Sequence, residues 1–146
     1  MLMSSNGMML MMFISMFIIQ YVFMSYVMTN SVENITNSIG KIYMSTIMGL
    51  FMVVAGVLMQ HKFVINQFLL YGSLLIGCIY LYKIQFGISE KEYLKEMIEH
   101  HSMALLTSKA ITEKSKDNDV LKLAQRIIQT QEKEINEMRS LINHKK

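Results

Sequence analysis

The sequence has no proline, no tryptophan and a single cysteine, and its first 32 residues carry no charged side chain. The lone cysteine, Cys78, has no partner in the sequence for an intrachain disulfide. A zinc finger built from cysteine thiolates is excluded for the same reason. The seven glycines are scattered and form no phosphate-binding loop. The missing proline and tryptophan, beside many Ile, Asn, Lys and Met residues, indicate an AT-rich coding sequence more than a structural demand.

Charged side chains are concentrated in the carboxy-terminal part of the chain. Of the 25 Asp, Glu, Lys and Arg residues, 21 fall within residues 84–146. The four others are Glu33, Lys41, Lys62 and Lys83. This division predicts a lipid environment for the first part and water for the second. In residues 84–146 eleven basic side chains oppose ten acidic ones without interleaved aromatics, a pattern that argues against a nucleic-acid partner.

Three uncharged apolar runs predict transmembrane helices at about residues 8–28, 42–60 and 63–82. Each run has close to the roughly 20 residues needed to cross a hydrocarbon core of about 30 Å. A cleaved signal peptide is the competing interpretation of the first run, but its basic region and small-residue cleavage site are not visible. We therefore expect a multi-pass membrane domain over residues 1–83 and a water-facing domain over residues 84–146.

Two local patterns refine the membrane domain. In the second run, Ser45, Gly49 and Gly56 form a stripe of small residues suited to close helix packing. The loop Gln60-His61-Lys62 is the only tight loop that is purely basic, and positive side chains favour the cytoplasm. This loop therefore predicts an amino terminus inside, with loop 29–41 and the carboxy-terminal domain outside.

Residues 84–146 have a helical period and predict a hairpin of about residues 90–112 paired with 119–143. Ser89 followed by Glu92 is a capping box that opens the first helix. The polar segment 113–119 separates the two helices, and its Asp and Asn side chains can cap the second one.

Each predicted helix has a polar residue at the centre of its apolar stripe, His101 in the first and Gln131 in the second. A polar group in that position needs a partner, or it costs about a kilocalorie per mole or more. With a turn centred near Lys116, antiparallel pairing places His101 level with Gln131. The same register places Met97 level with Ile135.

Two interpretations of these residues stay open. In one, His101 and Gln131 hydrogen-bond each other as a buried pair that sets helix register. In the other, Gln131 supports a metal site from outside its ligand shell. The candidate ligands are imidazole, thioether and carboxylate side chains: His101, His100, Met97, Met138, Glu134 and Met103.

Imidazole with thioether is a soft donor set that favours copper, particularly Cu(I). Adjacent histidines on a regular helix point about 100° apart, so His100 and His101 are not expected to chelate one ion together. His101 is at the stripe's centre and His100 at its edge, where it suits a partner chain. Catalysis is not expected, because no Ser-His-Asp arrangement and no pair of Glu-x-x-His motifs is recognised.

These two helices resemble the DUF305 family. Its hallmarks are Met-x-x-His-His, which begins here at Met97, and a second helix reading Ala-x-x-Ile-Ile-x-x-Gln-x-x-Glu-Ile-x-x-Met, which runs here from Ala124 to Met138. The motif residues by position are Met97, His100, His101, Gln131, Glu134 and Met138. Glu99 departs from the family pattern, in which many members have proline.

The resemblance implies a ferritin-like helical bundle and, for some members, extracytoplasmic copper binding and tolerance. Three spans ahead of one hairpin are similar to a membrane-anchored bacterial subgroup, which implies a bacterial inner membrane. A hairpin alone has too little core to be stable. We therefore expect a homodimeric four-helix bundle, with packing against the membrane spans as the substitute.

The expected function is thus copper binding or tolerance at a membrane surface. The expected partners are the lipid bilayer, a second copy of the chain and a metal-handling protein of unknown identity. The alternative is a metal-free structural or protein-interaction module of the membrane.

Overall fold

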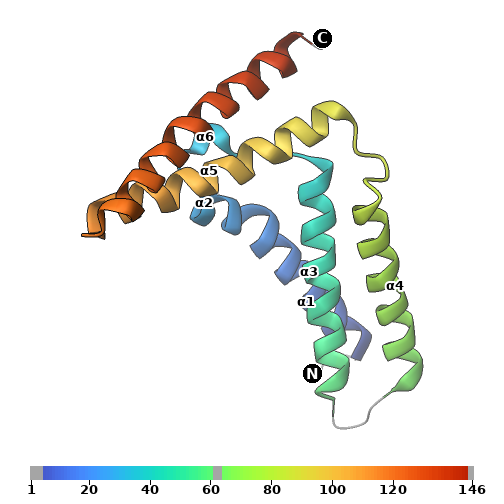
Figure 1. The fold of residues 1–146 in the computed structure, drawn as a ribbon. Helices are drawn as coiled ribbons and strands as arrows, with labels where there is room; N and C mark the ends of the chain where they lie inside the picture. The colour runs from blue at the N-terminus through green and yellow to red at the C-terminus, as the bar shows by residue number, and fades with distance from the viewer. Residues whose placement is uncertain (1–4, 61–63, 145–146) are drawn as a thin grey trace. The chain divides into compact units, whose positions relative to one another are not determined.

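The computed structural model describes residues 5–60 and 64–144, and all regular structure within them is helical (Figure 1). This confirms the all-α fold expected from the sequence. Contacts divide the chain into two units. The first comprises Met1–Met24 and Ile39–Gly87, and the second comprises Ser25–Ser38 and Ile88–Lys146.

Three helical stretches are long and apolar enough to cross a membrane. The first, Ser5–Met28, consists of α1 (Ser5–Ile18), the π-helical turn η1 (Ile19–Phe23) and α2 (Met24–Met28). The other two are α3 (Ile39–Leu58) and α4 (Ile65–Lys83).

The ends of these helices differ from the predicted spans by no more than three residues. Phe63, the first residue of the predicted third span, lies outside the described residues. His61 and Lys62, which carry the predicted orientation, also lie outside them.

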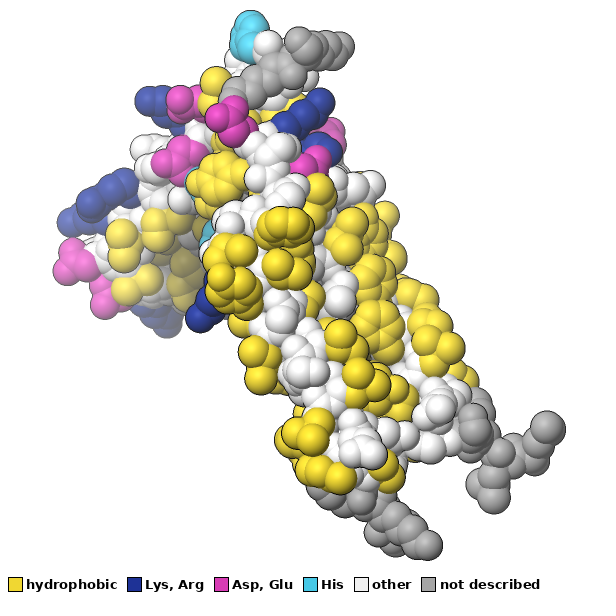
Figure 2. All heavy atoms as spheres, turned by 90° about the vertical axis from the view of Figure 1, so that its right-hand side faces the viewer, with side chains coloured by type: hydrophobic (Ala, Val, Ile, Leu, Met, Phe, Trp, Pro, Cys, Tyr) yellow, Lys and Arg dark blue, Asp and Glu magenta, His cyan; other side chains and the backbone are white. Residues whose placement is uncertain are grey.

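The small-residue stripe of α3 packs against α1, as the sequence predicts. Ser45 is fully buried, and Gly49 and Gly56 are buried beside it. A methyl group added at Gly49 would lie 2.8 Å from a ring carbon of Phe13, and one added at Gly56 would lie 2.5 Å from the terminal methyl of Met12. Glycine therefore allows the two helices to approach closely. Figure 2 shows hydrophobic side chains over the outward surface of the apolar helices, where lipid is the expected solvent.

The second unit contains the antiparallel pair α5 (Glu90–Lys114) and α6 (Asn118–His144) (Figure 1). The Ser89 hydroxyl accepts a hydrogen bond from the Glu92 backbone N–H, which confirms the predicted start of α5. Asp117 caps α6, because its Oδ1 accepts hydrogen bonds from the backbone N–H groups of Asp119 and Val120.

A third element of this unit comes from the link between the first two apolar helices. We call Ser25–Ser38 the strap. It contains the end of α2 and one 3₁₀ turn, η2 (Val32–Asn34), which contacts α5. Thr29, Asn34 and Ser38 of the strap are buried although they are polar. The hairpin is therefore covered along one side by a segment that precedes it by more than fifty residues.

Candidate metal centre

The site is built on the apolar core that joins α5 to α6. Ile98 and Leu105 of α5 pack against Ile135 and Met138 of α6, and all four are buried. Met97 is half-buried against the same cluster. These residues recur at three- and four-residue spacing on each helix, so one stripe per helix meets the other.

His101 faces α6 from this stripe. Its Nδ1 lies 3.1 Å from Oε2 of Glu134, and the His101 side chain is 16% exposed. Nδ1 is buried, and its contact with the Glu134 carboxylate is an ion-pair distance that is not counted as a hydrogen bond within the described residues. A neutral imidazole nitrogen is a common metal donor atom, and a carboxylate beside it can bind the same ion.

The contact between His101 and Glu134 implies a second one, one helical turn away. His101 lies one turn beyond Met97 on α5, and Met138 lies one turn beyond Glu134 on α6. Because the helices are antiparallel, His101 opposite Glu134 places Met97 opposite Met138, and both methionines belong to the same core cluster. We call Met97, His101, Glu134 and Met138 the quartet. The fold thus gathers one imidazole, one carboxylate and two thioethers within two helical turns.

This pairing lies three residues beyond the register expected from the turn. The turn between Lys114 and Asn118 is centred where the sequence predicts it, yet His101 meets Glu134 instead of Gln131. Helical side chains lean toward the amino terminus of their own helix, so each covers the surface about one residue before its Cα. In this antiparallel pair, side chains of α5 point away from the turn and those of α6 point toward it. A residue of α5 therefore contacts a residue of α6 that lies further from the turn than the one level with it.

The other predicted site residues lie around the quartet. His100 is exposed, and Met103 and Gln131 are half-buried. No hydrogen bond between His101 and Gln131 is found in the described part of the chain, where His101 Nδ1 stays unbonded. Across residues 5–60 and 64–144, no three side chains among His, Cys, Asp and Glu converge as a metal-binding group.

Glu99 has a role that sequence reasoning did not assign. Its carboxylate accepts hydrogen bonds from the strap at both oxygens, from the Ser25 hydroxyl at 3.0 Å and from the Thr36 backbone N–H. The Thr36 hydroxyl also donates to the backbone carbonyl of Lys95 at 2.7 Å. A loop needs partners for its backbone groups, and here a helix side chain supplies one.

Ser102 is the second strap contact on α5. It is fully buried, and its hydroxyl oxygen accepts hydrogen bonds from the Asn30 backbone N–H at 2.8 Å and the Asn34 side-chain amide at 3.1 Å. The Oδ1 of Asn34 accepts a hydrogen bond from Arg139 of α6 at 2.7 Å. Arg139 also donates to the backbone carbonyl of Glu33. The only sequence signal for these contacts was the Asn- and Ser-rich composition of the link.

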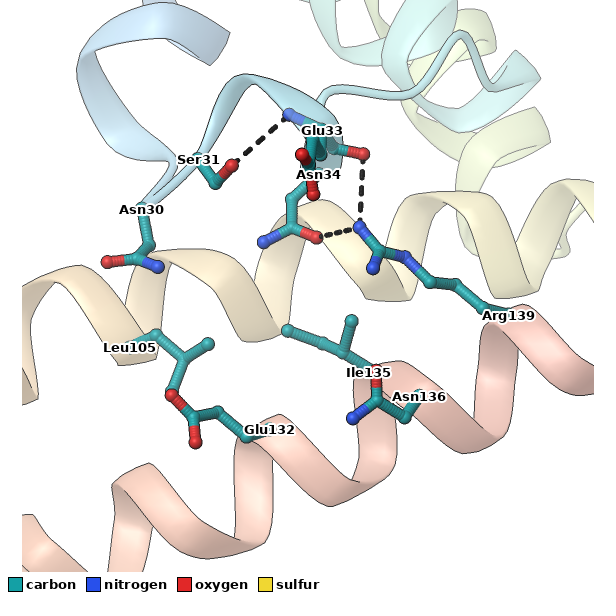
Figure 3. A pocket seen from close by; sticks show the side chains of 9 residues that line it. All are labelled: Asn30, Ser31, Glu33, Asn34, Leu105, Glu132, Ile135, Asn136 and Arg139. Atoms are coloured by element: carbon teal, nitrogen blue, oxygen red, sulfur yellow. Dashed lines mark hydrogen bonds between the residues drawn. The ribbon is translucent and has the colours of Figure 1, made fainter.

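A pocket of about 210 Å³ lies where the strap meets the hairpin (Figure 3). Leu105 and Ile135 line it from the core, and polar side chains of Asn30 from the strap and of Glu132 and Asn136 from α6 complete it. Glu132 is paired with Lys109 at 2.8 Å. The pocket lies on the strap side of the helix pair and does not include a quartet residue.

Comparison with known proteins identifies the family. Residues 81–145 match the family model described as Domain of unknown function (DUF305). The chain is also 34% identical over 145 residues to an uncharacterized protein of Acanthamoeba polyphaga mimivirus, an alignment that covers 97% of this chain and 95% of that relative. The chain belongs to the DUF305 family. No solved structure matches it.

The match places the quartet inside the DUF305 domain and leaves the strap outside it. In this DUF305 protein the compact unit therefore has two pieces, the matched hairpin and Ser25–Ser38. The alignment with the viral relative spans nearly the whole chain, so that similarity is not confined to the hairpin.

Proposed function

We propose that this DUF305 protein is a membrane-anchored protein whose hairpin binds copper outside the cytoplasm. The observation that carries the proposal is the quartet, in which the buried Nδ1 of His101 contacts the Glu134 carboxylate and two methionines of the adjoining core lie one turn away on the same helices. Imidazole, thioether and carboxylate together fit copper better than they fit magnesium or calcium, which prefer oxygen ligands alone.

The membrane part of the proposal rests on three apolar helices of sufficient length. The strap follows the first of them, and the hairpin follows the third. Since two crossings separate the strap from the hairpin, both lie on the same side of the membrane. Their many hydrogen bonds require that shared side. We propose that this side is extracytoplasmic, and that the membrane is a bacterial inner membrane as in the similar three-span subgroup.

Each member of the quartet has a distinct role in the proposed centre. His101 supplies an imidazole nitrogen, and Met97 and Met138 supply soft sulfur donors that favour the reduced ion. Glu134 is 43% exposed, so it can reach either the ion or solvent. Copper bound there would add a soft Lewis acid to an otherwise apolar helix contact.

His100 and Met103 lie outside the quartet and suit transfer of the ion. His100 is exposed on α5, while Met103 is half-buried. We propose that they are auxiliary ligands, which meet copper as it is exchanged with a second copy or with a metal-handling partner. Gln131 then acts as a polar neighbour of the centre and not as a ligand.

We also propose a homodimer that completes a four-helix bundle. The hairpin leaves Ile111, Val120 and Leu123 exposed by 40%, 41% and 52%. A second hairpin would cover such residues and enlarge a small core. Chemical cross-linking in detergent should give a dimer band that Leu123→Glu weakens, and a monomer under all conditions would contradict the dimer.

Copper retention by the full chain tests the metal proposal. The protein, purified in detergent, is loaded with Cu(I) under reducing conditions, desalted and analysed by mass spectrometry for metal. We expect about one copper per chain, and a loss of affinity of roughly tenfold or more in His101→Ala, as for loss of a ligand or its support. Met97→Leu and Met138→Leu should weaken Cu(I) binding while their cores stay filled.

Matched controls distinguish copper binding at the quartet from nonspecific binding of copper to other histidine and methionine side chains. His144→Ala removes an exposed imidazole near the end of α6, and Met59→Leu removes a thioether that is 85% exposed. Both variants should retain copper like the unmodified protein. Equal retention in His101→Ala and His144→Ala would contradict the proposed centre.

A metal-free interaction module is the second candidate function. It is favoured by the absence of three converging His, Cys, Asp or Glu side chains in the described residues. In that case His101 and Glu134 only set helix register, and an apolar pair should be as stable or more so. His101→Leu combined with Glu134→Leu would then keep or raise the melting temperature of a protein that retains no copper. Copper retention by the unmodified protein would contradict this candidate.

A further inference from the structure

One side-chain amide connects the two helices of the hairpin. Nδ2 of Asn34 donates to the Ser102 hydroxyl on α5, and Oδ1 of the same amide accepts from Arg139 on α6. Asn34 is 6% exposed, so both hydrogen bonds are largely shielded from water. A shielded amide that keeps both partners holds them at a defined separation.

The strap reaches α5 on a different face from the quartet. Glu99 and Ser102 are three residues apart and share one face, whereas Met97 and His101 are four apart and face α6. Ser102 is the direct neighbour of His101, about 100° around the helix. The strap and the quartet thus hold the same short stretch of α5 from two sides.

The strap also holds the part of the hairpin that the turn does not constrain. The turn joins the helices at Ser115–Asp117, and Arg139 lies five turns or more along α6 from there. We call the end of the hairpin opposite the turn the open end. Besides the core residues, the hydrogen bonds of Asn34 to Ser102 and Arg139 connect the two helices there. Without these bonds of Asn34, the bond from Arg139 to the Glu33 carbonyl and the apolar contacts would be left to resist separation of the helices there.

We propose that the strap is a clasp that sets the separation of α5 and α6 beside the quartet, with Asn34 as its closing residue. Opening the clasp lets α6 move away from α5 and separates Glu134 and Met138 from His101 and Met97. Because the strap continues from the first apolar helix, a displacement of that helix reaches the quartet through it. The clasp stands on its own contacts, and only its effect on copper rests on the proposed function.

Distance measurements on the metal-free full chain test the clasp. Spin labels at Lys91→Cys and Ser140→Cys, both exposed near the open end, report helix separation in a Cys78→Ser background. Asn34→Ala should lengthen and broaden the distance distribution between them. Labels at Glu113→Cys and Lys122→Cys near the turn should give an unchanged distribution.

Two further variants test separately the contact of the strap with α6 and its contact with α5. Arg139→Ala should broaden the open-end distances while the backbone amides of Asn30 and Thr36 stay protected, because the strap keeps Glu99 and Ser102. Ser102→Ala should broaden the distances and also speed hydrogen exchange at Asn30 by roughly tenfold, as expected for loss of a hydrogen bond.

Ser108→Ala and Asn143→Ala are the controls. The first removes a buried hydroxyl from the same helix nearly two turns away, and the second removes an exposed amide near the end of α6. Both should match the unmodified protein in distances and exchange. Unchanged open-end distances in both Asn34→Ala and Arg139→Ala would overturn the clasp.

A copper titration then separates the two proposals. Asn34→Ala should weaken copper binding by roughly tenfold, in line with removal of a supporting contact. If the unmodified chain binds no copper while Asn34→Ala still separates the helices, the clasp stands and the proposed function fails. If copper binds equally to both proteins although the helices separate, the clasp does not govern the centre and this part of the inference is overturned.

Discussion

Glu99 and Ser102 bind the strap, while His101 between them faces the other helix. All three lie within a single turn of α5, and each contacts a different partner because its side chain points to a different side of the helix. Sequence periodicity placed His101 at the centre of the apolar stripe and His100 at its edge, and in the structure His101 is half-buried while His100 is exposed. It did not identify Glu99 or Ser102, because their partners lie more than sixty residues earlier in the chain.

The buried glycines of α3 give a prediction at the scale of single residues. Gly49→Ala should destabilise the packing of α1 on α3 by about 1–3 kcal/mol, because its methyl would meet the ring and backbone of Phe13. Gly56→Ala should cost less, since the flexible end of Met12 can move aside. The measurement is unfolding by increasing SDS in mixed micelles, followed by circular dichroism.

Gly72→Ala in α4 is the matched control. A methyl group there meets no atom within 4 Å, so the better helix former should leave stability unchanged or raise it by up to about 1 kcal/mol. Equal losses at Gly49 and Gly72 would show that the close approach of Gly49 to Phe13 does not decide the result.

In helices α5 and α6, local sequence signals determine where each helix begins and ends but do not determine which residues of the two helices contact each other. Their ends lie within two residues of the prediction, because Ser89 and Asp117 cap them through their own side chains. The level of His101 was predicted from the turn alone, and its side chain contacts Glu134, three residues beyond the Gln131 expected at that level. The lean of side chains toward each helix's amino terminus accounts for the difference.

The cap of α6 gives a prediction at the scale of the element. Asp117→Ala leaves two backbone N–H groups of the first turn without their acceptor and should destabilise the hairpin by about 1 kcal/mol. Asp117→Asn keeps an acceptor oxygen and should cost much less. Thermal unfolding, with hydrogen exchange at Asp119 and Val120 as the local readout, measures both. Lys116→Ala, an exposed change in the same turn, should be neutral; an equal loss there would contradict the capping role.

At the scale of the whole molecule, the proposed three-span topology places the strap and the hairpin on one side of a membrane. In a Cys78→Ser background, single cysteines at the exposed positions Glu33 and Glu113 should react with a membrane-impermeant maleimide in the same vesicle orientation. A cysteine at Met59, beyond the other end of α3, should react only in the opposite orientation. Labelling of Glu33→Cys and Glu113→Cys from opposite sides would contradict the three-span topology.

Much of the fold follows from patterns that lie within one helix length. Uncharged runs of about twenty residues predict helices that can cross a membrane, and the period of apolar residues predicts the hairpin and its core. The motif residues likewise predict the family, which the comparisons confirm. These properties depend on spacing along the chain, and spacing is visible in the sequence.

Tertiary structure alone decided which segments contact one another. The sequence predicts a polar loop at residues 29–41 of the membrane domain, whereas contacts place Ser25–Ser38 in the compact unit with α5 and α6. Hydrogen bonds between an Asn- and Ser-rich link and a helix carry no periodic signal, because each depends on the direction of one side chain. The same holds for the pairing of His101 with Glu134, which depends on the direction in which the side chains of the two packed helices point.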